Sequence, residues 1–147
     1  MKENKVIVEK LNELLADFQI YYQNLRGFHW NIQGKEFFEL HVKFEELYTD
    51  AAMKVDEIAE RILTIGGTPL HSFEDYLATA QIKPVKNVHD GVTSVKTVVA
   101  NLEQIVAKEK EMKDLAGEAN DGGTEDQMSA LIEEQEKTLW MYKAWLK

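Results

Sequence analysis

Two histidines and two acidic residues in the first half of the chain have types and spacings that suit metal binding. His29 and His41 flank a short break at residues 31–35, and Asp56 and Glu60 follow in the segment DEIAE. Imidazole nitrogens and carboxylate oxygens together suit Fe(II), Mn(II) or Zn(II). A lone histidine is more often structural than a ligand, so the interpretation depends on whether the fold brings these side chains together.

Hydrophobic periodicity predicts that most of the chain is helical. Apolar residues recur every three or four positions, and Asn31 with Gly34 supplies a break after the first helix. The Gly66-Gly67 pair, with Pro69 just beyond, is a strong stop signal for the second helix. We expect four long helices, over residues 4–31, 35–65, 90–117 and 124–146, and a short helix near residues 72–80.

These elements predict an all-α fold, a ferritin-like four-helix bundle with a short extra helix in the long crossover between helices two and three. We expect a single domain over residues 1–147. The segment TEDQ indicates a capping box at the start of the last helix, with Thr124 as N-cap and Gln127 reaching back. Conventional di-iron bundles carry Glu-x-x-His pairs within one bundle, and this chain has none, which argues against an intrasubunit di-iron centre.

Helix geometry indicates that the second helix alone cannot assemble the ligand set. His41 and Glu45 are one turn apart, and Asp56 and Glu60 form a second such pair on roughly the same face. At ~1.5 Å per residue the two pairs lie ~16 Å apart along the axis, too far to hold one metal. A second copy packed antiparallel, across a two-fold axis near residues 50–51, would bring the first pair against the partner's second pair. The spacing therefore predicts an intersubunit site for iron, manganese or zinc, which the first histidine could join.

The composition narrows the class of protein. The 147 residues carry a formal net charge of −9 and no cysteine, which excludes disulfides and thiolate metal sites. An acidic surface attracts cations, whereas binding nucleic acid would require a basic face or tail. The sequence has no apolar signal-peptide core and no run of ~18 apolar residues. We expect a cytoplasmic protein with no membrane partner.

Three stretches, GFHWNIQG, FFELHVKFEELY and VDEIAERILTIGGTPL, resemble the Dps family, the miniferritins, and the resemblance extends over essentially the whole chain. It implies a homododecameric cage that oxidises Fe(II), usually with hydrogen peroxide in preference to dioxygen. The ferric product would be stored in the cage, so the protein would act as an iron store and as a defence against oxidative stress. It implies iron as the metal and no organic cofactor.

The resemblance also implies a ferroxidase centre at each two-fold interface, shared between subunits. Its ligands would be His29, His41 and Glu45 from one subunit and Asp56 and Glu60 from its mate. Trp30 is expected to be a packed core or interface aromatic, although relatives have a tryptophan near the iron centre that could quench oxidising radicals.

Acidic residues around the start of the last helix form a second predicted site. The resemblance places Asp121 and Asp126, in the segment EANDGGTEDQ, at a three-fold entry pore, where carboxylates would concentrate Fe(II). The same acids could simply favour a helix N-terminus.

Three other functions stay open at this point. Many relatives bind DNA through lysine-rich tails. This sequence has none, so we expect DNA binding to be absent and keep a DNA-binding nucleoid protein with secondary iron binding as the alternative. The others are a shell loaded with zinc or manganese, and a purely structural bundle, which would leave the His, Asp and Glu spacing unexplained.

Overall fold

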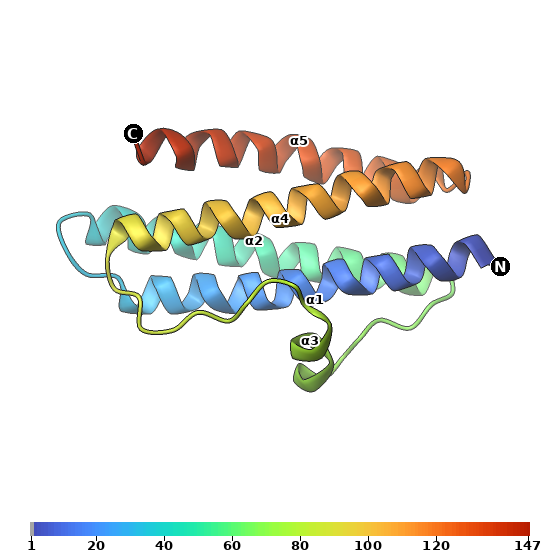
Figure 1. Ribbon diagram of the computed structural model, residues 1–147, viewed down its shortest axis with the longest axis horizontal. Coiled ribbons are helices and arrows are strands. Elements are labelled where there is room, and N and C mark those ends of the chain that lie inside the picture. Colours follow the sequence, from blue (N-terminus) through green and yellow to red (C-terminus); the bar gives the residue numbers. More distant parts are fainter. Residues whose placement is uncertain (1) are drawn as a thin grey trace.

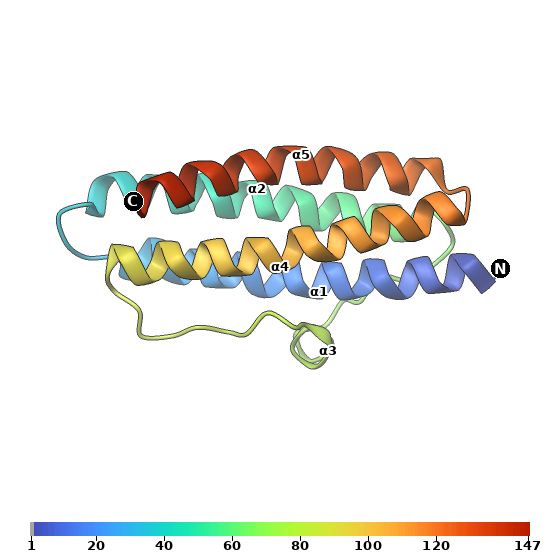
Figure 2. The ribbon, with the colours of Figure 1, turned by 45° about the horizontal axis from the view of Figure 1, so that its top comes forward.

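Four long helices lie side by side in the computed structural model, which describes residues 2–147 (Figure 1). Figures 1 and 2 show α1 antiparallel to α2 and α4 antiparallel to α5, with a crossover that runs along the outside of the bundle. The predicted all-α bundle with one long crossover is confirmed. The helices are α1 (Lys2–Asn31), α2 (Phe37–Thr64), the short α3 (Phe73–Thr79) in the crossover, α4 (Gly91–Glu118) and α5 (Gly122–Trp145).

The bundle forms because each long helix has an apolar stripe with helical spacing. On α1, Leu11, Leu14, Phe18 and Leu25 are almost completely buried, and they recur every three, four or seven residues. Within residues 2–147, no helix is both long enough and apolar enough to span a membrane.

The turns on either side of α2 are where glycine signals predict them. Gly34 has a φ of 110° in the turn that joins α1 to α2. At the other end, Gly66 has a φ of 92°, and Gly66 and Gly67 donate backbone hydrogen bonds to Leu63 and Ile62 in a Schellman arrangement. A Cβ at position 67 would lie 2.6 Å from a methyl group of Val8. These two turns fix the register of α2 against α1.

The start of α5 differs from the prediction. Asp121, not Thr124, is the N-cap, because its carboxylate accepts a hydrogen bond from the Thr124 N–H at 3.1 Å. Gln127 donates to the Glu57 carbonyl at 3.3 Å instead of reaching back to a cap. The helix therefore begins at Gly122, two residues before the predicted start at residue 124. Gly123 lies against the Arg61 guanidinium, and a Cβ there would require that group to shift.

A buried aspartate holds the crossover against the bundle. The Asp17 Oδ1 atom accepts hydrogen bonds from the Gln81 N–H at 2.7 Å and the Ile82 N–H at 3.0 Å. Its Oδ2 atom accepts from Lys108 Nζ, on α4, at 2.7 Å. Asn24 makes a similar set of contacts one segment further along the crossover. Because these partners lie far apart in the sequence, the contacts tie the two antiparallel helix pairs together.

Candidate metal centre

His29 and His41 lie face to face, one near the end of α1 and the other in the first turns of α2. Their ring centroids are 3.8 Å apart and the planes differ by 10°. The turn at Gly34 brings them together, because it reverses the chain between the two helices. The fold therefore brings these two predicted ligands together across the turn, and their role as ligands stays a prediction.

Each histidine is held by the backbone of the other. His29 Nδ1 lies 2.6 Å from the His41 carbonyl oxygen, and His41 Nδ1 lies 2.7 Å from the His29 carbonyl oxygen. A carbonyl oxygen can only accept, so each Nδ1 carries the proton and donates it. In the neutral ring the other nitrogen, Nε2, then keeps its lone pair and is available to a metal ion. The two rings are therefore both oriented and in the ligating tautomer.

Aromatic side chains pack around the histidine pair. Phe37 stacks on His41, with ring centroids 4.9 Å apart, and Tyr48 meets His29 edge to face at 5.3 Å. As a result, His29 is only 7% exposed. Neither aromatic is among the site residues predicted from the sequence. Helical spacing could have found Phe37, which precedes His41 by one turn.

Glu45 is the one predicted carboxylate that the single chain places beside the histidines. Its Oε1 atom lies 3.7 Å from His29 Nε2, and its side chain is 58% exposed. Asp56 and Glu60 are exposed on the same helix, and their separation of eleven or more residues from Glu45 corresponds to ~16 Å or more. Within residues 2–147, no group of three or more His, Cys, Asp or Glu side chains is placed to hold a metal ion. One chain therefore brings together only part of the predicted set.

The outer face of α2 is exposed and unusually apolar for a solvent surface. Ala52 lies between the two acidic pairs and shares their exposed side of the helix. Ala51, in contrast, is buried inside its own bundle, and Asp50 pairs with Lys54. Ala51 is therefore turned toward the core of its own bundle, and the two-fold contact near residues 50–51 stays a prediction. Large exposed apolar side chains on α2 are Phe38, Val42, Met53 and Leu63.

Trp30 does not belong to the core of the described chain. It is 57% exposed, and the Arg26 guanidinium lies over its ring, 4.9 Å from the centroid. The core interpretation is wrong, because Trp30 follows His29 and so points to the opposite side of α1 from the buried stripe. Its place at an interface stays a prediction.

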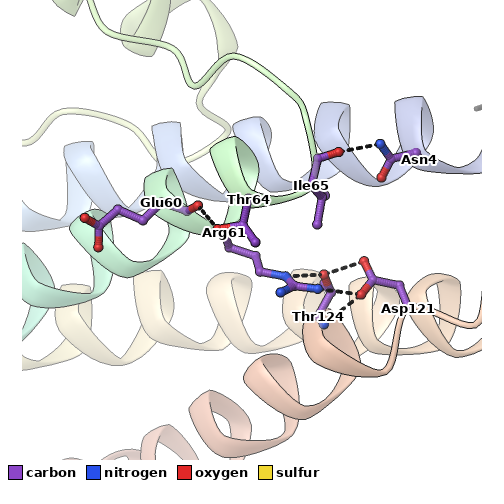
Figure 3. A network of polar contacts seen from close by, with 7 residues as sticks. All are labelled: Asn4, Glu60, Arg61, Thr64, Ile65, Asp121 and Thr124. Carbon is purple, nitrogen blue, oxygen red and sulfur yellow. Dashed lines mark hydrogen bonds and ion pairs between the residues drawn. The ribbon is translucent and has the colours of Figure 1, made fainter.

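The two predicted pore residues have different surroundings. Asp121 is half-buried and accepts hydrogen bonds from Arg61 at 2.7 Å and from the Thr124 hydroxyl at 2.6 Å (Figure 3). Burial alone would raise the pKa of Asp121, but the Thr124 and Arg61 hydrogen bonds lower it below its ordinary value. Asp126 is exposed. Figure 3 also shows the Glu60 carboxylate pointing away from this network, free of the Arg61 ion pair.

The long crossover between α2 and α4 and the pairing of antiparallel helices define a ferritin-like bundle. Comparison with known proteins agrees, since residues 8–147 match the ferritin-like domain family. A DNA protection during starvation protein from Porphyromonas gingivalis is 46% identical over 147 residues, covering 99% of this chain and 92% of that protein.

Two solved structures are similar to this chain over nearly their full lengths. The crystal structure of a Dps protein from Vibrio cholerae O1, described as a member of a broad superfamily of ferritin-like diiron-carboxylate proteins, is 50% identical. Its TM-score is 0.98, and the match covers 99% of this chain and 92% of that one. A Dps protein from Bacillus brevis is 37% identical with a TM-score of 0.97, covering 100% and 99%. The chain belongs to the Dps family of ferritin-like proteins.

Proposed function

We propose that the protein is a ferroxidase and iron store, with an iron-oxidising centre at the two-fold interface between antiparallel subunits of a dodecameric cage. The observation that carries this proposal is the reciprocal hydrogen bonding of His29 and His41, which leaves both Nε2 lone pairs available. Metal-ligating histidines commonly donate their other ring N–H to a backbone carbonyl in this way. Family membership and the description of the Vibrio cholerae relative as ferritin-like and diiron-carboxylate support the same chemistry.

The partner subunit would supply the missing carboxylates. In an antiparallel contact over the outer face of α2, the His41 and Glu45 end of one helix meets the Asp56 and Glu60 end of the other. Ala52, near the middle of this face, allows close approach, and the exposed apolar side chains beside it would be buried by the contact. The site would then have two imidazoles from one chain and carboxylates from both, a donor set that suits Fe(II).

The chemistry uses hydrogen peroxide as a two-electron oxidant. Two Fe(II) ions, as substrates, give up one electron each, the O–O bond breaks, and two hydroxide ions form. No hydroxyl radical is released, because both electrons are delivered together. The role of the chain is to hold the two ions close to one another with neutral imidazoles and anionic carboxylates, which stabilise the higher charge of Fe(III).

Protection of DNA, which the names of several relatives describe, does not require contact with DNA. Removing Fe(II) and peroxide together prevents the radical chemistry that damages nucleic acids. The formal net charge of −9 opposes binding to a polyanion. We therefore propose protection without direct binding, and retardation of duplex DNA in a gel at physiological salt would contradict this part.

We further propose that Asp126 helps to concentrate Fe(II) at a three-fold entry pore. Its exposed carboxylate near the start of α5 supports this role. Asp121, whose carboxylate is already shared between Arg61 and Thr124, would contribute mainly by holding that helix end in place.

Stopped-flow absorbance of the assembled protein, loaded anaerobically with Fe(II) and mixed with peroxide, tests the proposal. We expect rapid ferric formation in the wild type and a rate close to that of free Fe(II) in Asp56→Ala. The matched control is Glu57→Ala, which removes the adjacent exposed carboxylate and should keep the wild-type rate. A normal rate in assembled Asp56→Ala would contradict the site.

A further inference from the structure

Phe37 lies beside the histidine pair, but the proposed centre assigns no role to it. It is in the first turn of α2, one helical turn before His41, and its ring stacks on the His41 ring. The two centroids are 4.9 Å apart and the planes differ by 16°. His29 is stacked on His41 in the same way, at 3.8 Å and 10°. The His41 imidazole therefore contacts two nearly parallel rings, one from its own helix and one from α1.

The start of α2 lacks the side-chain cap that later helices have. Its N-cap residue, Glu36, makes no capping hydrogen bond, whereas α3, α4 and α5 each begin with a side chain that accepts a hydrogen bond from the first turn. Without such a cap, the first turn of a helix is less stable. Phe37 is half-buried against the core, and its N–H donates to the Gly34 carbonyl at 3.2 Å. Packing of the Phe37 ring therefore holds the turn that leads into His41.

His29 depends on different contacts. It is buried, and Tyr48 meets it edge to face, with ring centroids 5.3 Å apart. The ring contacts of Phe37 are to His41 and Phe38. A change at Phe37 should therefore act on His41 much more than on His29.

We propose that Phe37 is a positioning residue for the metal ion held by His41, and that it raises the affinity of this imidazole for a divalent cation. The inference rests on the proposed function, which makes His41 a ligand. The stacked ring limits rotation of the imidazole, so less freedom is lost when an ion binds. An imidazole that shares its lone pair with a metal ion also carries part of the positive charge, which the negative face of the Phe37 ring attracts. Both effects favour the metal-bound form.

Binding of Co(II) to the assembled protein tests this proposal without iron or oxidant. Imidazole and carboxylate ligands accept Co(II), and the visible absorption of the bound ion reports its ligands. The titration is made in two backgrounds: His29→Ala, in which only His41 supplies an imidazole to the centre, and His41→Ala, in which only His29 does. We expect Phe37→Leu to weaken Co(II) binding about 3- to 10-fold in the first background and less than about 2-fold in the second.

Two variants, each made in the His29→Ala background, separate the ring contact from a general loss of packing. Phe37→Tyr keeps the stacked ring and should bind Co(II) as tightly as the background alone. Phe44→Leu removes a fully buried ring of the same helix that packs on Phe28, with centroids 5.8 Å apart. It should lower stability without weakening Co(II) binding. If Phe37→Leu does not assemble, Phe37→Met removes the ring, keeps an apolar side chain, and should show the same loss.

Three results would overturn the inference. These are an unchanged Co(II) affinity when Phe37→Leu is added to His29→Ala, an equal loss in Phe44→Leu, and a loss of the same size in the His41→Ala background. The proposed centre would fail through a different result, namely Co(II) binding that neither His29→Ala nor His41→Ala changes. The two failures are therefore distinguishable.

Discussion

Replacing Asp17 with asparagine tests how the crossover is attached to the bundle. Asp17 is 1% exposed and is the main partner of the buried Lys108 ammonium, since Glu13 is 3.9 Å from the same nitrogen. Asparagine keeps an oxygen for the two crossover N–H groups but removes the negative charge. Breaking a buried pair by removing one partner costs about 3–5 kcal/mol, because the other charge is left unpaired. We expect Asp17→Asn to lower the free energy of unfolding by that amount.

A double-mutant cycle measures the interaction free energy between Asp17 and Lys108 apart from their contacts with other residues. Lys108→Met removes the ammonium but keeps an apolar stem of similar length. The double variant Asp17→Asn/Lys108→Met should lose less stability than the two single variants together, because no unpaired charge remains. Chemical denaturation, followed by circular dichroism at matched protein concentration, provides the four free energies.

An exposed pair gives the control for this cycle. Lys10 and Glu111 lie 3.3 Å apart, with half of the glutamate side chain accessible to solvent. Glu111→Gln should change stability by about 0.5 kcal/mol or less. The reasoning would be refuted if Asp17→Asn cost no more than Glu111→Gln, or if the effects of Asp17→Asn and Lys108→Met were simply additive.

Three further predictions concern other buried contacts. Burial raises the pKa of Glu109 from 4.5 to about 8, so stability should fall as pH rises through that window. At about 1.4 kcal/mol for each pH unit, the wild-type free energy of unfolding should fall by a total on the order of 5 kcal/mol across this window. Glu109→Gln cannot titrate, so its stability should depend less on pH when denaturation is measured across the same range. An unchanged pH profile would contradict this prediction. Arg61→Ala removes the hydrogen bond and ion pair to the start of α5, and should speed amide exchange there, at a cost of ~1–3 kcal/mol. Gly67→Ala should cost ~1–3 kcal/mol in denaturation, because its Cβ would clash with Val8; wild-type stability would show that the turn adjusts freely.

The sequence predicts the elements well because their signals are local. The break near Gly34 and the stop at Gly66 depend on backbone conformations that glycine adopts readily, so they can be recognised without a structure. The sequence alone places the start of α5 too late, because Asp121 and Thr124 are both good N-cap residues. Only the contact of Asp121 with Arg61 decides between them.

The candidate site could be predicted only in part from the sequence. The approach of His29 to His41 follows from helix, turn and helix, but their stacking and reciprocal hydrogen bonds depend on side-chain packing. Lys54 and Glu109 look like ordinary surface charges in the sequence, and only the packing of four helices shows that they are buried. The ligands that the partner subunit would supply are inferred from two-fold symmetry, because a single chain does not contain them in one place.

The central claim is that each iron-oxidising centre takes its ligands from two subunits, and mixed cages test it most directly. One variant lacks the histidine ligands, through His29→Ala and His41→Ala, and the other lacks the carboxylates, through Asp56→Ala and Glu60→Ala. Cages of either variant alone should oxidise Fe(II) with peroxide no faster than free Fe(II).

Co-assembly of the two variants in equal amounts should restore activity. With random pairing, half of the two-fold contacts join unlike chains, and each such contact contains one intact centre, which gives about one quarter of the wild-type rate. Only a centre shared between subunits predicts this recovery. Co-assembled cages, verified to contain both variants, that stay as inactive as either variant alone would contradict the account.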